Sequence, residues 1–127
     1  MRRETGSAAV SPDADDLLAQ QLRQLRREYL LDSTKRLDEL RQFSARLANN
    51  DRTALAGLHQ AFHRLAGSGG SYGFPAVTST SREGERVAKE LESAGTPIAP
   101  GDVQAIDGCI EGVANAFGEA RKAAGPD

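Results

Sequence analysis

The chain has 127 residues, a length that suits one domain. Its 16 basic and 18 acidic residues give a formal net charge of −2, which argues against a dedicated nucleic-acid binder, because such proteins present a net basic surface. No apolar run approaches the ~20 residues that cross a bilayer. The single cysteine, Cys109, excludes an internal disulfide and favours a reducing, cytoplasmic setting.

The first part of the chain predicts a tail and then one or two helices. Residues 1–11 are small and polar and predict a disordered N-terminal tail. Ser11 and Pro12 predict a helix start, because serine caps helices and proline suits the first helical position. Apolar residues follow at helical spacing in two series: Leu18, Leu22, Leu25 and Tyr29, then Leu30, Leu37, Leu40, Phe43 and Leu47. The pattern fits one long helix or two helices with a break near Asp32.

Three more amphipathic helices are predicted in the rest of the chain. Asp51 suits the cap of the first, which we expect to fray or end within the glycine-rich segment 67–73. Pro75 and Pro100 suit the first turns of the other two. The apolar residues of the three faces are Leu55, Leu58, Phe62 and Leu65; Phe74, Val77, Ser81, Gly84, Ala88 and Leu91; and Val103, Ile106, Ile110, Val113 and Phe117.

These elements predict an all-α fold, because no segment alternates with period two as a half-buried strand would. The expected architecture is an antiparallel four-helix bundle with an additional N-terminal helix or helical extension. We expect the bundle to span residues 12–122 and a C-terminal tail to span residues 123–127.

The two histidines, His59 and His63, lie one turn apart on the same predicted helix. On a helical wheel His63 points about 130° from the core direction and His59 about 90°, so His63 should be exposed and His59 should lie at the boundary. The face around His63 carries small residues at Ala56, Gly67 and Gly70. Glycine inside a helix is unfavourable by ~1 kcal/mol relative to alanine. Either the helix ends near Gly67, or a bare face lets another protein approach the imidazole.

The segment from His63 to Phe74, HRLAGSGGSYGF, resembles the signature of histidine phosphotransfer (HPt) domains. His63, Leu65, Gly67, Ser68 and Gly73 match the family pattern at its spacing. The resemblance implies that His63 accepts a phosphoryl group from an aspartate of a receiver domain and passes it to another receiver in a phosphorelay. The chain departs from the pattern at Ala66, where the family often has a lysine.

The resemblance also suggests roles for neighbours of His63. Glu85 lies where the family places a residue beside the ring; a carboxylate there would accept from Nδ1–H and leave Nε2 as the nucleophile. The competing interpretation is an exposed acid paired with Lys89. Lys89 and Arg64 are candidates for stabilising the phosphoryl charge, and Arg52 joins them in the predicted charged rim. The predicted docking residues are Ala56, His59, Gly67, Ser68, Gly70 and Tyr72.

The partners that the resemblance implies are receiver domains of response regulators and of a hybrid sensor histidine kinase. We expect a phosphoryl carrier without kinase activity, because segment 67–73 lacks the Lys-Ser/Thr that completes a phosphate-binding loop. No cofactor of its own is expected, since Mg²⁺ would be bound by the receiver. The expected protein is a cytoplasmic monomer that binds neither nucleic acid nor membrane.

Three other interpretations remain open. His59 and His63 could bind a metal ion with a carboxylate such as Glu85, although the residue after His59 is not the glutamate of an HExxH site. The missing lysine allows an HPt-like interaction module that binds receivers or a kinase without carrying phosphate. A bundle without a signalling role would leave the small residues around His63 unexplained.

Overall fold

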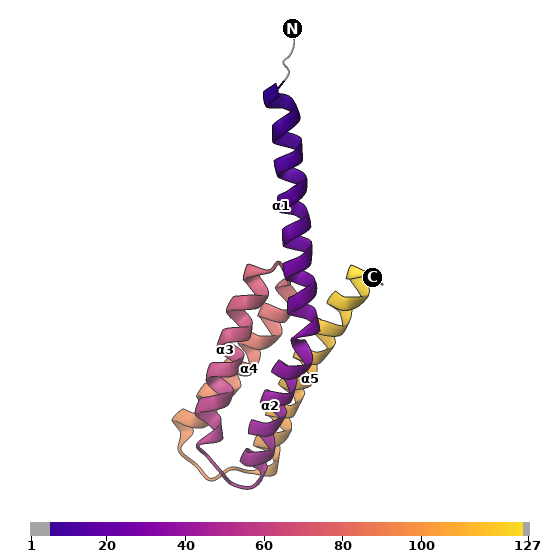
Figure 1. Ribbon diagram of the computed structural model, residues 1–127. Coiled ribbons are helices and arrows are strands. Elements are labelled where there is room, and N and C mark those ends of the chain that lie inside the picture. Colours follow the sequence, from indigo (N-terminus) through magenta and orange to yellow (C-terminus); the bar gives the residue numbers. More distant parts are fainter. Residues whose placement is uncertain (1–5, 126–127) are drawn as a thin grey trace.

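The computed structural model describes residues 6–125, with side chains from residue 14 onward (Figure 1). Its helices are α1 (Gly6–Leu31), α2 (Ser33–Ala48), α3 (Ala54–Ser71), α4 (Pro75–Ala94) and α5 (Pro100–Ala124). No strand occurs within residues 6–125, and the prediction of an all-α fold is confirmed.

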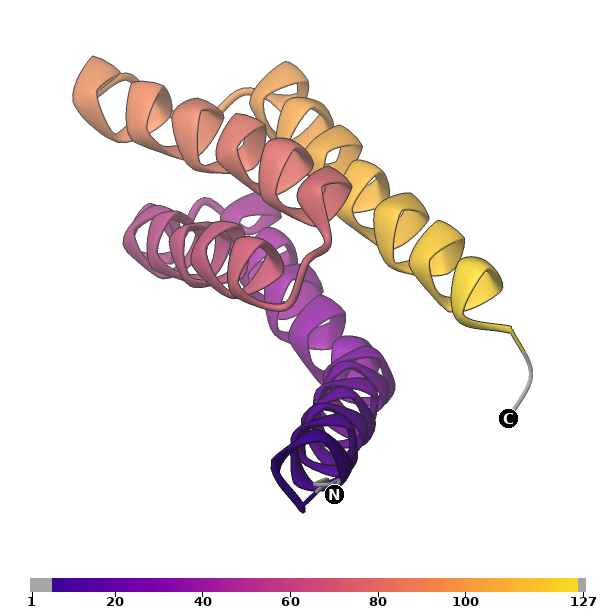
Figure 2. The same cartoon turned by 90° about the horizontal axis from the view of Figure 1, so that it is seen from above.

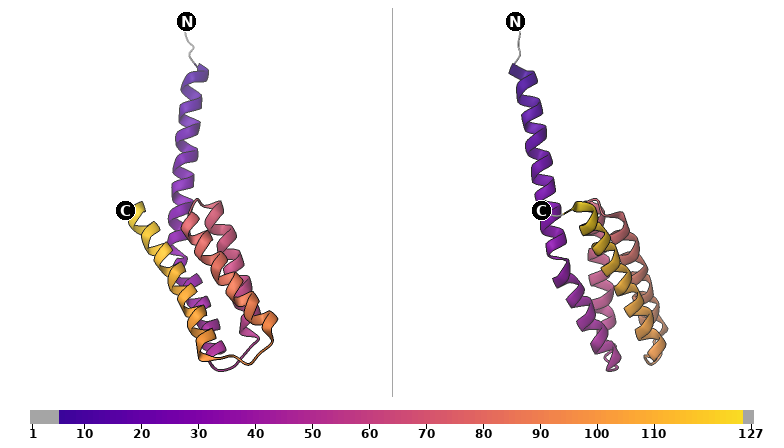
Figure 3. Two further views of the ribbon diagram at one scale, coloured as in Figure 1. Left: turned by 180° about the vertical axis from the view of Figure 1, so that it is seen from behind. Right: turned by 90° about the vertical axis from the view of Figure 1, so that its right-hand side faces the viewer.

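Helices α2 to α5 form an antiparallel four-helix bundle, and α1 is the additional N-terminal helix that the sequence predicted (Figures 1 and 3). Seen from above, α3 and α4 lie side by side and α5 packs against α4 (Figure 2). The apolar stripes of the four helices meet in one core, as amphipathic helices require. The largest fully buried apolar side chains are Phe62, Phe117, Leu40, Leu47, Leu55, Leu58, Ile106, Ile110, Val77 and Val113.

A single residue, Asp32, separates α1 from α2, which answers the question that the sequence left open. Its backbone angles of φ −79° and ψ −7° are nearly helical, so α2 continues in roughly the direction of α1 (Figure 1). The hydroxyl of Ser33 donates to the carbonyl oxygen of Leu30 at 2.6 Å and accepts from Arg121 Nη1 at 2.6 Å. Arg121 belongs to α5, and this bond ties the junction to the bundle.

Two predicted boundaries were wrong. Helix α1 begins at Gly6, so residues 6–11 are helical where a tail was predicted; Ala8 and Ala9 have the highest helix propensity. Residues 1–5 of that tail lie outside the described residues. Helix α5 ends at Ala124, two residues beyond the predicted limit of the bundle.

Helix α3 continues through Gly67 and ends at Ser71, within the glycine-rich segment where the sequence predicted its end. A loop of three residues then leads into α4, and it contains Gly73 with φ +84°, a conformation that favours glycine. The N–H of Phe74 donates back to the carbonyl oxygen of Gly69 at 2.7 Å. Because the connection is short, α3 and α4 must be antiparallel neighbours.

The first leucine series is not covered by the bundle. Leu18, Leu22 and Leu25 are exposed, whereas Tyr29, the next residue of the same series, is buried. The sequence interpretation that placed this stripe inward therefore holds only for the last turns of α1. Figures 1 and 3 show the reason: most of α1 projects beyond the end of the bundle.

Candidate functional site

Two glycines allow α3 and α4 to approach closely. A methyl group on Gly84 would overlap the ring of Phe62, so the ring occupies the space that a side chain on α4 would fill. Nearer the loop, a methyl group on Gly69 would lie 2.9 Å from Thr78 Oγ1. The Thr78 hydroxyl donates to the carbonyl oxygen of Ala66 at 2.7 Å. His63 and Glu85 each follow one member of the Phe62–Gly84 contact, so this contact brings their side chains together.

His63 and Glu85 form the central pair of the site. His63 Nδ1 lies 2.9 Å from Glu85 Oε2, a normal hydrogen-bond distance. The side chain of His63 is 72% exposed and that of Glu85 is 25% exposed. An Nδ1–H that donates to the carboxylate leaves Nε2 as the ring nitrogen with a free lone pair. The arrangement is that of an exposed nitrogen nucleophile with an acidic partner.

His59 shares the same carboxylate. Its Nε2 lies 3.3 Å from Glu85 Oε2, and its Nδ1 lies 3.8 Å from Glu92 Oε1. The imidazole is only one-third exposed, as the helical wheel indicated. Glu85 is therefore held between two imidazoles one turn apart on α3. Sequence reasoning did not find Glu92, although its position seven residues after Glu85 places it on the same side of α4.

Small residues surround His63 along α3. Ala56, Gly67 and Gly70 are exposed and lie in line with His63 on the helix surface. A methyl group on Gly67 would meet nothing within 4 Å, and one on Gly70 would meet only Thr78 Oγ1 at 3.5 Å. Because α3 continues through Gly67, the helix end does not explain this glycine. The backbone of α3 is thus open to a large approaching surface on both sides of His63.

Two predicted docking residues face α1 instead. The hydroxyls of Ser68 and Tyr29 are hydrogen-bonded at 2.7 Å. The ring of Tyr72 stacks on that of Tyr29 with centroids 4.7 Å apart, and the Tyr72 carbonyl oxygen accepts from Arg26 Nε at 2.8 Å. Burial raises the pKa of Tyr29, so its hydroxyl stays protonated and available for the bond to Ser68. Ser68 and Tyr72 anchor α1 and do not join the face around His63.

The predicted cations do not contact His63 in the structure. Arg64 Nη2 lies 3.7 Å from Glu39 Oε1 on α2. In the antiparallel α3–α4 pair, the His63–Glu85 contact places Lys89 level with His59. Arg52 donates to the carbonyl oxygens of Thr96 and Leu91 near the end of α4, the second at 3.2 Å.

The remaining titratable groups with altered pKa values lie away from the imidazoles. On α4, the guanidinium of Arg86 bonds both Glu83 and Glu90, and it lowers the pKa of the Glu83 carboxyl. Burial raises the pKa of the Cys109 thiol, so little of it is thiolate near neutral pH. Neither group has the exposed, unprotonated nitrogen or sulfur that nucleophilic chemistry requires.

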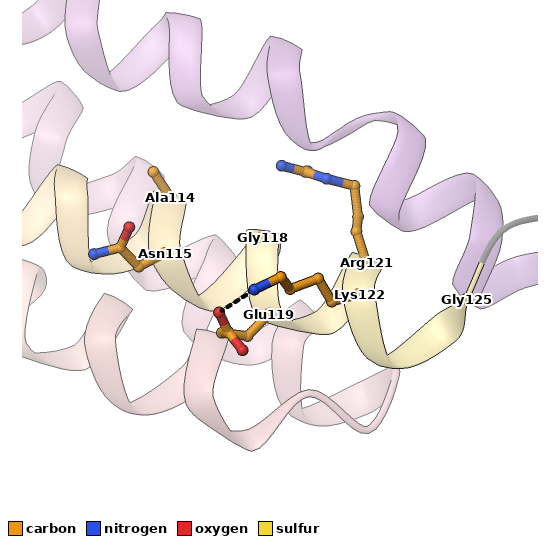
Figure 4. A pocket seen from close by; sticks show the side chains of 7 residues that line it. All are labelled: Ala114, Asn115, Gly118, Glu119, Arg121, Lys122 and Gly125. Atoms are coloured by element: carbon orange, nitrogen blue, oxygen red, sulfur yellow. Dashed lines mark ion pairs between the residues drawn. The ribbon is translucent and has the colours of Figure 1, made fainter.

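One surface hollow on α5 lies apart from the imidazoles. Figure 4 shows its lining, which consists of Ala114, Asn115, Gly118, Glu119, Arg121, Lys122 and Gly125. Lys122 and Glu119 form an ion pair across it at 3.7 Å, whereas the side chain of Arg121 points away toward the N-terminal helices. An exposed pair of this kind contributes at most about 1 kcal/mol.

Two further features of residues 6–125 bear on other kinds of chemistry. Within residues 6–125, no group of three or more His, Cys, Asp or Glu side chains is arranged to hold a metal ion. In the same part of the chain, no helix combines the length and the apolar character that spanning a membrane requires.

Comparison with known proteins adds one finding. The model of a family described as the Hpt domain matches residues 16–116, which include α2, α3, α4 and much of α1 and α5. No curated protein and no solved structure matches the chain.

Proposed function

The chain belongs to the Hpt domain family, whose members carry phosphoryl groups in two-component phosphorelays, and we propose that His63 is its phosphoryl-accepting residue. The observation that carries the proposal is the 2.9 Å contact between His63 Nδ1 and Glu85 Oε2 on an otherwise exposed imidazole. A ring held by one nitrogen presents the other to an incoming phosphoryl group.

The proposed transfer begins on a phosphorylated aspartate of a receiver domain. The lone pair of His63 Nε2 attacks phosphorus, an N–P bond forms, and the O–P bond breaks with its electron pair returning to the aspartate carboxylate. The Nδ1 proton stays on the ring, where Glu85 stabilises the positive charge that develops on the imidazole. Attack by the aspartate of a second receiver reverses these bond changes and regenerates His63.

We place the partner over the small-residue face formed by Ala56, Gly67 and Gly70. These positions let a receiver bring its phosphoaspartate close to His63 without meeting a bulky side chain. His59 lies at the border of this face. Receivers of response regulators and of a hybrid sensor histidine kinase are the partners we propose, in a cytoplasmic setting where such relays operate.

We propose that the receiver supplies most of the charge that neutralises the phosphoryl group, through Mg²⁺ bound to its own residues. This chain offers little near His63, because Arg64 is paired with Glu39 and Lys89 is level with His59. Arg64 is the nearer candidate, since its ion pair is about half exposed on both sides and exposed pairs are weak. It would have to leave Glu39 to contact the phosphoryl group.

One observation favours a second candidate function. Ala66 is buried and stands where the family often has a lysine, so no cation extends from that position toward His63. An interaction module that binds receivers without accepting phosphate would not need such a cation. The two proposals agree on the docking face and differ on whether an N–P bond forms.

The test uses intact-mass spectrometry of the full chain with a phosphorylated receiver as the donor, and with phosphoramidate and Mg²⁺ as a second donor. We expect a single acid-labile phosphoryl adduct that a second receiver removes. His63→Gln should abolish the adduct, and the matched variant His59→Gln should keep it. A chain that binds phosphorylated receivers but never acquires the adduct would establish the interaction module instead.

Glu85→Gln tests the positioning role of the carboxylate. Loss of the negative charge should slow transfer to His63 by about tenfold to a hundredfold while leaving receiver binding within about twofold. The ¹⁵N chemical shifts of His63 provide the second readout, because the fraction of the Nδ1–H tautomer should fall. An unchanged tautomer together with an unchanged rate would assign Glu85 to a structural role.

A further inference from the structure

A second hollow lies between the C-terminal part of α1, the loop before α4 and the end of α5. Its volume is about 650 Å³, which is within the range of sites that bind small organic molecules. The apolar lining includes Leu30 and Phe74, and the polar lining consists of four arginines: Arg23, Arg26, Arg27 and Arg121. We call it the arginine hollow. Neither histidine lines it, so it is separate from the site around His63.

The arginine hollow concentrates positive charge on a chain whose net charge is −2. Elsewhere arginines form ion pairs with carboxylates, namely Arg36, Arg41, Arg46, Arg64 and Arg86. Within residues 14–125, no aspartate or glutamate lines the hollow, and Arg23, Arg26 and Arg121 form no ion pair. The C-terminus of α5 contributes only about half a negative charge nearby. The hollow should therefore attract anions.

Two of these guanidinium groups are held in place and still have donors for a ligand. Arg26 Nε donates to the carbonyl oxygen of Tyr72 at 2.8 Å, and Arg121 Nη1 donates to the hydroxyl of Ser33 at 2.6 Å. Gly73 makes room for Arg26, because a methyl group there would lie 3.0 Å from Arg26 Nη2. Since a guanidinium has five N–H donors, each bond leaves several for a ligand. Donors that are already oriented lose less entropy when a ligand binds.

The lining identifies a phosphate group attached to an apolar body as the ligand chemistry that fits. A phosphate ester carries a charge of about −2 near neutral pH and three acceptor oxygens, and the planar fork of arginine matches it in paired hydrogen bonds. A carboxylate has one charge and two oxygens, so it satisfies fewer of these donors. Leu30, Phe74 and Ala120 offer apolar surface to the rest of the ligand. An acidic partner protein fits less well, because protein interfaces are broad, whereas this hollow has the size of a small-molecule site.

We propose that the arginine hollow binds a small organic phosphate, with the phosphate group on Arg23, Arg26 and Arg121 and the apolar body against Leu30 and Phe74. Because α1, the loop before α4 and α5 all line the hollow, the bound ligand would also stabilise the attachment of α1 to the bundle. The inference goes beyond the proposed function and does not depend on it, since the hollow would bind its ligand even if no phosphoryl group were ever transferred.

Titration of the full chain with naphthyl phosphate, followed by ¹H–¹⁵N NMR, tests the proposal. We expect saturable shifts of the Gly73 and Ala120 amides with a Kd of about 0.1–1 mM, and no shift of the His63 amide. Arg23 is exposed and has no partner within residues 14–125, so Arg23→Gln breaks no contact of the fold and should weaken binding about threefold to tenfold. Arg82→Gln is the matched control: it changes the net charge equally, but Arg82 is an exposed residue of α4 outside the hollow, so binding should stay as in the wild type.

Inorganic phosphate and naphthol each carry one part of the probe and should bind at least about tenfold more weakly than naphthyl phosphate. Ala124→Glu adds a carboxylate to the exposed edge of the hollow and should weaken binding more than about tenfold, while thermal unfolding verifies that the variant stays folded.

No shift of these amides up to about 10 mM naphthyl phosphate would overturn the proposal, as would equal weakening by Arg23→Gln and Arg82→Gln. Equal binding of inorganic phosphate would contradict it too, because the attraction would then be that of any anion for exposed arginines. Shifts of the same amides with a receiver domain, and none with naphthyl phosphate, would assign the hollow to a protein interface instead.

Discussion

Helices α3 and α4 pack so closely that the ring of Phe62 occupies the side-chain space of Gly84, whereas α1 leaves three leucines of its apolar stripe in water. Both regions have apolar residues at helical spacing, so periodicity alone does not distinguish them. The connections do: the three-residue loop before Pro75 reverses the chain, and the single residue Asp32 does not. Periodicity thus shows that a helix has a face to bury, and the connection decides what lies against it.

The largest expected effect is on the free energy of unfolding, when one leucine from each region is shortened to alanine. Leu58 on α3 is fully buried, so Leu58→Ala should lower the free energy of unfolding by about 2–5 kcal/mol through lost burial and a cavity. Leu22→Ala should change it by less than about 0.5 kcal/mol at protein concentrations where the chain is monomeric. Urea denaturation measures both. A comparable loss in Leu22→Ala would show that the stripe is covered within one chain.

Two glycines of the histidine site give the next contrast. Gly84→Ala should destabilise the bundle by about 1–3 kcal/mol, because its methyl group must displace Phe62 and separate α3 from α4. Gly67→Ala should be stabilising by up to about 1 kcal/mol, since the position is helical and the space around it is open. Thermal unfolding shows whether each variant is more or less stable than the wild type. A destabilising Gly67→Ala would contradict the finding that the space around Gly67 is open.

The junction of the two regions depends on the Tyr29 hydroxyl. Tyr29→Phe removes its hydrogen bond to Ser68 and should cost about 1 kcal/mol, and adding Ser68→Ala should cost little more. Burial raises the pKa of Tyr29 above its usual value near 10. Wild-type stability should therefore fall as the pH rises above that value, because the unfolded chain loses this proton first. In Tyr29→Phe the free energy of unfolding should depend less on pH in this range. Equal pH dependence in the two proteins would show that Tyr29 is not the cause.

The smallest effect concerns His59, which shares Glu85 with His63. His59→Leu removes the imidazole whose Nε2 lies 3.3 Å from the Glu85 carboxylate and should slow phosphoryl transfer to His63 by about threefold. His59→Gln keeps a polar side chain beside Glu85 and should restore most of the rate. Transfer rates measured beside the ¹⁵N shifts of His63 distinguish this effect from lost packing. Equal rates in the leucine and glutamine variants would show that His59 does not act through Glu85.

Much of the bundle could be predicted from the sequence because its signals are local. Pro75, Pro100 and the apolar stripes give the helix starts and the buried faces, and the wheel gives the exposure of His63 and His59. The contact between Glu85 and His63 was one of two interpretations, since spacing cannot show whether a side chain reaches the neighbouring helix. Register between helices depends on packing, and Gly84 was recognised only as part of an apolar face.

The errors have a common physical origin in side chains that find partners far away in the sequence. Ser68 and Tyr72 were grouped with His63 because they are close to it in the sequence, yet Tyr29 and Arg26 of α1 engage them. Arg64 was placed near His63 by adjacency, but Glu39 on α2 attracts it. A helix end near Gly67 was one of two interpretations of that glycine, and α3 continues past it to Ser71.

The bare backbone at Gly67 and Gly70 also affects how selective this surface is for its binding partners. A surface with few side chains has few groups that could clash with one partner and make favourable contacts with another. It therefore discriminates poorly among proteins of similar shape. The positions Gly67 and Gly70 also provide no aromatic or arginine side chain of the kind that gives long-lived complexes, so we expect a partner to dissociate quickly. Brief encounters of this kind suit the proposed phosphoryl carrier, which would bind one receiver to accept the group and another to pass it on.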